Sequence, residues 1–277
     1  MISVVICSRK TDIPAEARQN IVETNGGEFE LVIIDNSSNN YSIFQAYNQG
    51  VQRAKGDILC FMHDDVLFRS KNWGDVIERH FQEDEQIGLI GFAGTHFLPD
   101  IPMYWYSSPF VSQHNLNNDQ GMVEEHFHEG WFGERNLIEA VAVDGLCFFV
   151  RRELFEKISF DEKTFKGFHL YDMDLCMQVL EAGYKVCVCR DVLVEHSWSE
   201  QKQFSKSGGD LFANNLELFV QKWHDHFPIH QGLDLPEEVF ERVNVLFRQA
   251  YDAKKARASK AYRLGRALLM PFKWMKK

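Results

Sequence analysis

Short apolar runs alternate with longer, mixed stretches over the first 62 residues. The runs 2–7, 31–34 and 58–62 are aliphatic and β-branched, and each is closed by polar or charged residues, which is typical of buried strands. The stretches between them, 14–24 and 41–54, are predicted to be helices. The order strand–helix–strand–helix–strand predicts parallel pairing with right-handed crossovers. We therefore expect an α/β fold with a mostly parallel sheet flanked by helices.

Polar residues and glycines mark where predicted helices begin and end. Asp12 is a candidate cap for the first helix, with Pro14 near its start. Ser70 is a candidate cap for a third helix. One face of this helix carries a mostly apolar stripe formed by Trp73, Val76, Ile77, His80 and Phe81. Gly183 ends a later predicted helix, 171–182. Two aspartates lie in the first turn of this helix, where the helix dipole favours acidic residues.

The middle of the chain has a less regular pattern. Residues 88–94, 140–150 and 184–195 are predicted strands, and the last of them ends in the polar cluster His196-Ser-Trp-Ser. Residues 95–140 are rich in aromatic side chains and histidine without a clear period. We expect a long loop there, and such loops in compact domains are usually functional or mobile.

Helical patterns dominate the C-terminal part, over 214–223, 236–250 and the tail. We therefore predict a principal domain over 1–205 and a helical C-terminal region over 206–277. Within the principal domain, residues 1–95 carry the alternating strands and helices, and 96–205 the irregular part.

The chain is acidic with a basic end. Its formal net charge is −10 over 277 residues, yet nine of its 30 Lys and Arg follow Asp252, where no Asp or Glu occurs. An acidic body argues against nucleic acid as the main partner, because cationic contacts dominate binding to phosphate backbones. It is compatible with an anionic substrate whose charge is offset by a bound cation.

Composition predicts a cytoplasmic protein. The six cysteines form no C-x-x-C pair and lie mostly in apolar runs, as reduced core thiols do. The N-terminus lacks the basic segment of a signal peptide, and no apolar stretch reaches the roughly 20 residues of a spanning helix.

The segment His63-Asp64-Asp65 is the first candidate site, because open α/β sheets bind ligands at the carboxyl ends of their strands. In an extended backbone, His63 and Asp65 point one way and Asp64 the other. An imidazole and a carboxylate on one side can hold a divalent cation, and hard oxygen ligands suit Mg²⁺ or Mn²⁺. The alternative is a polar strand end with a solvated acidic turn.

Two other motifs have weaker signals. His126 and His128 share one face of an extended segment and can ligate zinc, although such pairs are more often solvated surface. The glycines at 88, 91 and 94 are spaced G-x-x-G-x-x-G, unlike the dinucleotide-binding G-x-G-x-x-G, and no G-x-x-x-x-G-K phosphate loop occurs. The sequence therefore disfavours a Rossmann dehydrogenase or a P-loop enzyme.

Taken in order, these motifs resemble those of family-2-type glycosyltransferases with the GT-A fold, over roughly residues 1–200. The resemblance is carried by a first strand, then Ile33-Ile-Asp35-Asn-Ser, Asn48-x-Gly50, Ala54-Lys-Gly-Asp-Ile58, Phe61-Met-His-Asp-Asp65, Asp144-Gly145 with Arg151, Tyr171-Asp-x-Asp-Leu175, Ala182-Gly-Tyr-Lys185 and His196.

The resemblance implies a role for particular positions. It places the nucleotide-sugar donor against Ser8, Arg9, Asp35, Asn48 and Asp64. A D-x-D motif that holds Mn²⁺ or Mg²⁺ corresponds to His63-Asp64-Asp65, with His63 and Asp65 as ligands and His196 completing the set. The Asp of an E-D pair, Asp172, is implied as the general base, and the acceptor is expected near Asp144, Gly145, Tyr171 and Trp198. Two residues depart from the common pattern: His63 replaces the first Asp of D-x-D, and Tyr171 replaces the Glu before the base.

The implied activity is inverting, metal-dependent transfer of a sugar, from a UDP-sugar, to a hydroxyl of a glycan or lipid-linked acceptor in surface polysaccharide biosynthesis. A nucleotidyltransferase is the less favoured enzyme, because Ser8-Arg9-Lys10 lacks the glycines of its loop. A non-catalytic sugar-nucleotide or glycan-binding module with a decayed metal motif is the other alternative, and His63 is its only support.

The basic tail is predicted to lie on an anionic membrane surface. Its cations are interleaved with aromatic and aliphatic side chains and with no acid, which is typical of an interfacial helix. This predicts a peripheral protein on the inner face of the plasma membrane. The alternatives are a tail folded onto the acidic body and a helix that pairs with another subunit in a homo-oligomer.

Overall fold

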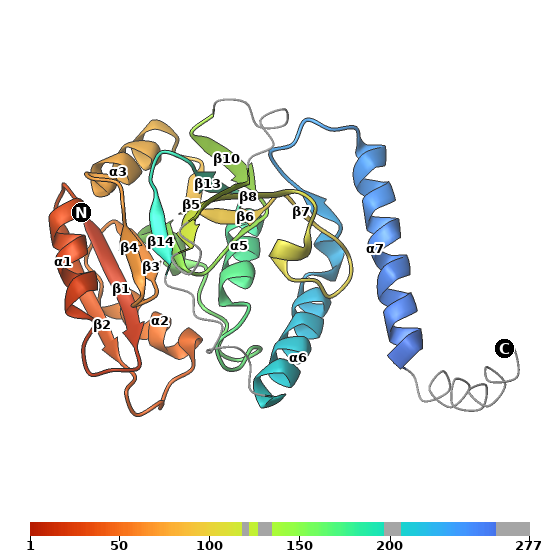
Figure 1. Ribbon diagram of the computed structural model, residues 1–277, viewed down its shortest axis with the longest axis horizontal. Coiled ribbons are helices and arrows are strands. Elements are labelled where there is room, and N and C mark those ends of the chain that lie inside the picture. The colour runs from red at the N-terminus through yellow and green to blue at the C-terminus, as the bar shows by residue number, and fades with distance from the viewer. Residues whose placement is uncertain (118–121, 127–134, 197–205, 259–277) are drawn as a thin grey trace, which may run out of the picture.

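A computed structural model describes residues 1–117, 122–126, 135–196 and 206–258, and within them the largest sheet has seven strands (Figure 1). Five strands run in the same direction, while β12 and β10 oppose them. The predicted α/β fold with a mostly parallel sheet is therefore confirmed. In spatial order the strands are β10 (Leu137–Ala140), β13 (Lys185–Cys189), β5 (Ile87–Gly91), β12 (Cys147–Arg151), β3 (Ile58–Met62), β1 (Ile2–Ser8) and β2 (Phe29–Asp35).

Helices cover both faces of this sheet. Side chains of α1 (Ala15–Thr24) and α3 (Trp73–Glu83) pack in one hydrophobic cluster, and those of α2 (Ile43–Arg53) and α5 (Tyr171–Glu181) in the other. Along β1, Val4 contributes to the first cluster and its neighbour Val5 to the second. Burial on both faces is the reason these strands are continuous apolar runs in the sequence.

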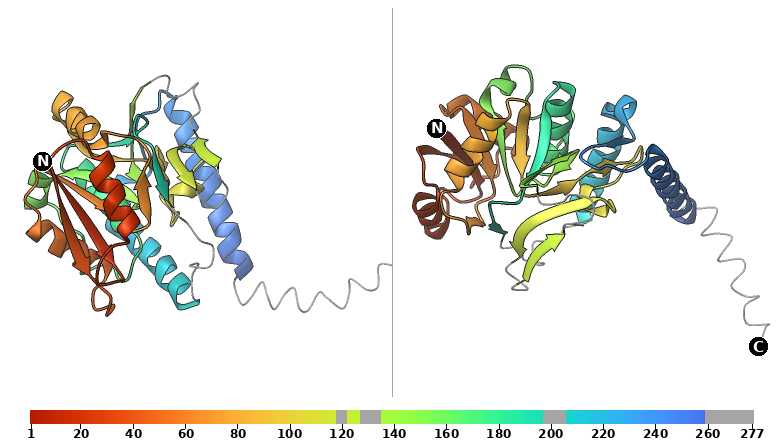
Figure 2. Two further views of the ribbon diagram at one scale, coloured as in Figure 1. Left: turned by 60° about the vertical axis from the view of Figure 1, so that its left-hand side comes forward. Right: turned by 90° about the horizontal axis from the view of Figure 1, so that it is seen from above.

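A second sheet stands beside the first, in the order β11-β6-β8-β14-β4, with β9 paired to β8. The β8–β9 hairpin extends away from the large sheet (Figure 2). The strands are β4 (Val66–Phe68), β6 (Ala93–Thr95), β8 (Val111–Asn117), β9 (Met122–His126), β11 (Ala142–Val143) and β14 (Val194–His196).

Three predictions of single strands were wrong because the chain passes between the two sheets at these points. Residues 88–94 divide into β5 and β6, residues 140–150 into β10, β11 and β12, and residues 184–195 into β13 and β14. Residues 88–94 are apolar or glycine throughout and give no sign of the change of sheet, because both sheets bury them. In the other two segments the changes fall near the polar residues Asp144 and Arg190-Asp191, which the strand pattern did not separate.

The prediction of a long loop over 95–140 was also wrong. It contains β7 (Phe97–Leu98), the 3₁₀ turn η1 (Trp105–Ser107), β8 and β9. The polar sequence of β8, Val-Ser-Gln-His-Asn-Leu-Asn, conceals a strand whose described side chains are mostly half-buried.

Two predicted helix caps were wrong as well. Pro14 occupies the N-cap of α1, and the Asp12 carboxylate accepts from the Ile13 amide and Arg18. Ser70 lies before the N-cap of α3 and accepts from the Leu193 amide. The capping box of α2 is formed by Ser42 and Gln45.

The C-terminal part is helical, as predicted, through α6 (Lys206–Lys222) and α7 (Glu237–Ala258). Short elements lie before α5 and between these two helices: η2 (Arg152–Glu156), η4 (His224–His226) and β15 (Ile229–His230), which pairs with β7. The helix predicted in the basic tail lies outside the described residues. None of the described helices has both the length and the apolar composition that crossing a bilayer requires.

Asp174 joins α5 to the end of α6. Its carboxylate is 1% exposed and accepts from Trp223 Nε1 at 2.8 Å and from Lys222 Nζ, which lies 2.8 Å from Oδ1. Gln178 donates to the other oxygen. Burial raises the pKa of this carboxyl, although Lys222 opposes the shift. Asp174 is therefore fully used in holding α6 in place.

Candidate active site

The carboxyl ends of three neighbouring parallel strands bring four of the five predicted donor residues to one edge of the large sheet. Ser8 ends β1 and is paired with Asp35 at the end of β2. Ser8 Oγ donates to Asp64 Oδ2 at 2.7 Å, which joins the end of β1 to the turn after β3. Asp35 is exposed, and bonds from Ser37 lower the pKa of its carboxyl. Arg9 is exposed directly after Ser8.

The turn His63–Asp65 lies where the two sheets meet. The His63 amide donates to the Leu146 carbonyl at 2.9 Å, and β4 then begins in the second sheet. Strand β14 pairs with β4 so that His196 lies opposite Val66. This register brings His196 next to Asp65 from a position 131 residues further along the chain.

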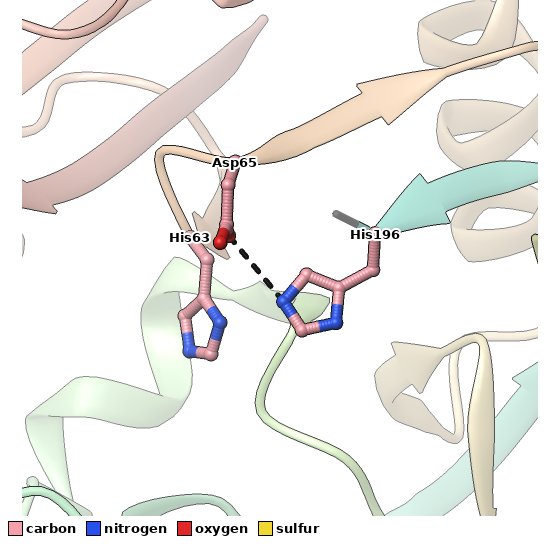
Figure 3. Close-up of side chains that lie close together, drawn as sticks. All are labelled: His63, Asp65 and His196. Atoms are coloured by element: carbon pink, nitrogen blue, oxygen red, sulfur yellow. Dashed lines mark ion pairs between the residues drawn. The ribbon is translucent and has the colours of Figure 1, made fainter. Parts of the chain in front are cut away.

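His63, Asp65 and His196 offer three ligand atoms that all lie within 4.8 Å of one another (Figure 3). His196 Nε2 lies 3.3 Å from Asp65 Oδ1, and the two imidazole centroids are 5.5 Å apart. Asp64 points to Ser8 instead, as the alternation argument predicted. Burial and the nearby His196 lower the pKa of His63 to about 4, so this imidazole is neutral at pH 7. Neutral imidazole is the form that ligates metals.

The donor set fits a divalent cation of the first transition row. Two imidazole nitrogens and one carboxylate oxygen form a softer set than Mg²⁺ prefers, whereas Mn²⁺ accepts both nitrogen and oxygen ligands. Three ligands on two adjacent segments leave positions for water or for oxygens of a bound diphosphate.

A second group, His80, Cys189 and Asp191, is equally close-packed. Here the hydrogen bonds within the group explain the arrangement: Asp191 accepts from the Cys189 thiol at 2.9 Å and lies 3.0 Å from His80 Nε2. Burial raises the pKa of the Cys189 thiol well above its usual range. This group ties α3 to the segment between β13 and β14.

Asp172 is a buried carboxylate in the first turn of α5. It is 3% exposed, and its two oxygens accept from the backbone amides of Gly145 and Met173, each at 2.9 Å. Burial, and then the negative charge of Asp144, raise its pKa to about 7. Each oxygen keeps a second lone pair, so a carboxyl poised near neutral pH is able to accept a proton.

The segment Asp144–Leu146 lies between this carboxylate and the His63 cluster. Asp144 is half-buried and accepts from the Leu146 amide at 2.8 Å and from Trp105 Nε1 at 3.0 Å. The Gly145 carbonyl accepts from the Tyr171 hydroxyl at 2.9 Å. Tyr171, expected on the acceptor side, is only 4% exposed, and its hydroxyl also lies 2.9 Å from His63 Nε2.

Asn48 is a predicted site residue that does not join this group. Asn48 uses its side-chain amide to hold the loop before α5, by bonds to both backbone groups of Phe160 and to Glu162. Trp198 lies outside the described residues, as does His128.

Phe168 lies beside the cluster, although the sequence did not single it out. Its side chain is 41% exposed, and its ring centroid lies 5.5 Å from that of His63 and 5.9 Å from that of Tyr171. An exposed aromatic face beside a candidate sugar site can pack against the C–H face of a sugar ring. Sequence gave no signal because this phenylalanine looks like the buried Phe165 in the same loop.

A model of a family described as "Glycosyltransferase like family" matches residues 3–223. The chain belongs to this glycosyltransferase-like family. The streptomycin biosynthesis protein StrF of Streptomyces griseus is 30% identical over 154 residues, which are 54% of this chain and 50% of StrF. The matched region thus spans about half the length of that relative.

Solved structures share the fold of this glycosyltransferase-like chain. A structure of GalNAc-T7 with UDP, GalNAc and Mn²⁺ has a TM-score of 0.58 at 15% identity, covering 81% of this chain and 49% of that one. Staphylococcus aureus TarS 1-349 in complex with UDP-GlcNAc has a TM-score of 0.51 at 13% identity, covering 89% and 71%. At these identities the likeness shows the fold alone, and it confirms the predicted GT-A architecture.

We expect Asp65→Asn to weaken Mn²⁺ binding by more than the tenfold to hundredfold that is typical of residues just outside a metal site. The substitution removes the only carboxylate of the three-residue cluster. Titration of Mn²⁺ into the protein, with free Mn²⁺ followed by electron paramagnetic resonance, measures the affinity.

Asp64→Asn is the matched control, because the adjacent carboxylate bonds to Ser8 and lies outside the cluster. Its Mn²⁺ affinity should stay within about threefold of the unsubstituted protein, well short of the loss expected at a ligand. Equal affinities of the Asp65→Asn variant and the unsubstituted protein would eliminate the cluster as a metal site.

Proposed function

We propose that the chain transfers a sugar, with inversion, from a UDP-sugar to a hydroxyl of a glycan or lipid-linked acceptor. The observation that carries the proposal is the convergence of three features at one edge of the large sheet. These are the strand ends that carry Ser8 and Asp35, a cluster fit for a divalent cation and a buried carboxylate with a pKa near 7. Family membership supports the reaction class.

In this proposal the donor lies over the ends of β1, β2 and β3. Asp35 accepts hydrogen bonds from the nucleoside, and Arg9 lies toward its phosphates. Ser8, which is buried, contributes by holding Asp64. UDP or a UDP-sugar is present in the two fold relatives named above, which supports uridine as the base. A bound Mn²⁺ would offset the charge that develops on the departing diphosphate. His63, Asp65 and His196 are the residues that would hold it.

Asp172 acts as the general base in this mechanism. An acceptor hydroxyl is a poor nucleophile until a carboxylate takes its proton in the transition state. Attack from the face opposite the diphosphate then inverts the anomeric carbon. Asp174, the first alternative for this role, is fully engaged with Trp223 and Lys222, so Asp144 is the remaining alternative.

In this proposal residues 1–95 bind the donor and 96–205 supply the base and the acceptor side. The C-terminal region, 206–277, places the enzyme at its acceptor. The exposed ring of Phe168 supports a sugar acceptor beside the cluster. We place the enzyme in the cytoplasm, at the inner face of the plasma membrane, in surface polysaccharide synthesis.

A donor screen with Mn²⁺ tests the function directly. Release of UDP from a panel of UDP-sugars, with and without candidate acceptors, should identify at least one donor that is turned over. Asp172→Asn keeps the shape of the side chain but cannot take the proton, so transfer should fall by about 10²–10⁴ while donor affinity is unchanged.

Two results would contradict this assignment. Turnover of no donor, together with tight donor binding, would indicate a binding module. Wild-type transfer by Asp172→Asn with a large loss in Asp144→Asn would move the base to Asp144.

The raised pKa of Asp172 predicts the pH dependence of transfer. A base works only when deprotonated, so kcat/KM for the acceptor should rise about tenfold per pH unit below pH 7 and level off above it. Asp144→Asn removes the negative charge that raises this pKa, so its acid limb should move to lower pH. Asp161→Asn is the control. The Asp161 carboxylate is paired with Lys222, and its substitution should leave the acid limb at the same pH. If the acid limb of Asp144→Asn stays at the same pH, the limb does not report the ionisation of Asp172.

The basic tail is expected to bind anionic lipid. Six of the nine cations after Asp252 follow Ala258, the end of α7, so truncation after Ala258 removes them and leaves that helix whole. Each cation near an anionic surface contributes about 1 kcal/mol. The full chain should therefore sediment with phosphatidylglycerol vesicles, and the 1–258 truncation should sediment much less.

Vesicles of phosphatidylcholine alone are the control, because the expected attraction is electrostatic. Equal sedimentation of both forms with anionic vesicles, or none by either, would show that the tail is not the anchor. A change of oligomeric state on truncation, seen by light scattering, would favour subunit pairing instead.

A further inference from the structure

We infer that Tyr171 is a positioning residue that fixes the ring of His63 for metal binding, so that the two departures from the common family pattern form one coupled unit. The inference rests on the proposed metal role of His63. It concerns a contact between two segments 108 residues apart: the Tyr171 hydroxyl lies 2.9 Å from His63 Nε2.

The direction of that hydrogen bond follows from a second contact. The Tyr171 hydroxyl also lies 2.9 Å from the Gly145 carbonyl oxygen, and a carbonyl can only accept. The single hydroxyl proton is therefore donated to Gly145. The hydroxyl oxygen is left as an acceptor, so His63 Nε2 must carry a proton and donate it.

This arrangement selects one tautomer of His63. A neutral imidazole with its proton on Nε2 has its lone pair on Nδ1. Figure 3 shows one ring nitrogen of His63 turned toward Asp65 and His196 and the other turned away from them. Since Nε2 is held by Tyr171, the nitrogen that faces the cluster is Nδ1, and it is the one with the free lone pair. A hydrogen bond to the distal ring nitrogen is the usual way in which proteins orient metal-binding histidines.

Packing holds Tyr171 where this bond requires it. Its ring centroid lies 5.5 Å from that of Tyr47 and 6.3 Å from that of Phe44, both nearly perpendicular to it. On the opposite side, a Cβ on Gly145 would stand 2.2 Å from the Tyr171 hydroxyl oxygen. The glycine therefore allows the close approach, and the aromatic rings prevent the hydroxyl from moving away.

The two residues therefore depend on each other. An aspartate at position 63 is shorter than histidine and has no N–H to donate, so the hydroxyl would lose this partner. A phenylalanine at position 171 would leave Nε2 without its acceptor and the ring free to adopt either tautomer. Substitutions at 63 and 171 should consequently be strongly non-additive, as is typical of residues in direct contact.

Mn²⁺ affinity, measured without donor or acceptor, tests the coupling. Tyr171→Phe should weaken Mn²⁺ binding about tenfold, in the range typical of residues that orient metal ligands. In a His63→Asp background the same substitution should have little effect, because no imidazole remains to be oriented. Tyr184→Phe is the matched control, because Tyr184 is a half-buried tyrosine just before β13. This variant should bind Mn²⁺ with the affinity of the unsubstituted protein.

A measurement on the unsubstituted protein avoids any effect of substitution on folding. Nitrogen-15 spectra of labelled histidine in the metal-free protein at pH 7.5, assigned with His63→Gln, should show His63 protonated on Nε2 and bare on Nδ1. Tyr171→Phe should give a mixture of tautomers. A proton on Nδ1 in the unsubstituted protein would overturn the inference.

The outcomes separate this inference from the proposed function. If Asp65→Asn leaves Mn²⁺ binding unchanged, the metal site itself is wrong. If Asp65→Asn weakens binding while Tyr171→Phe changes the Mn²⁺ affinity by the same factor in both backgrounds, or in neither, the metal site stands and the role of Tyr171 is wrong.

Discussion

Two consecutive residues of α5 hold the backbone of Gly145, one at its amide and one at its carbonyl, and the candidate site depends on these contacts. Its amide donates to Asp172 and its carbonyl accepts from Tyr171. The next residue, Leu146, accepts from the His63 amide. One tight turn thereby sets the position of the proposed base relative to the proposed metal ligands. No side chain fits at Gly145, because a Cβ there would collide with the tyrosine hydroxyl.

The first turn of α5 serves two purposes because its aspartates lie two residues apart and so face different directions. Asp172 faces the turn at Gly145, and Asp174 faces the end of α6. Desolvation raises the pKa of both carboxyls, but only Asp174 has a cation beside it. A buried carboxylate with a cationic partner holds structure together, whereas one bonded only to amides keeps the capacity to take a proton near neutral pH.

Local pattern was sufficient for the strands β1, β2 and β3 and for the turn after β3, because a strand buried on both faces is a continuous apolar run. It was insufficient where the chain changes sheet. At Phe92 burial continues through the change, and at Asp144–Leu146 the interruption is a half-buried aspartate followed by a glycine. The proximity of His196 to Asp65 depends on the pairing of β14 with β4, which no local pattern reveals. The contact of Tyr171 with His63 was likewise hidden, although both residues had been singled out as departures from the family pattern.

The charges around the cluster explain why donor binding and cation binding should be linked. Asp64, Asp65 and Asp144 all act on His63, and His63 is itself neutral at pH 7. A diphosphate brought to this edge therefore meets carboxylates and the neutral imidazole of His63, and its charge adds to that of the carboxylates. Placing a cation between them replaces repulsion with attraction on both sides, and the partial exclusion of water strengthens this effect. An imidazole in place of the first aspartate of the motif lowers the negative charge at the site by one while keeping a ligand atom. With this substitution a cation would be bound less by charge and more by the orientation of its ligands, which is the property that we propose Tyr171 to control.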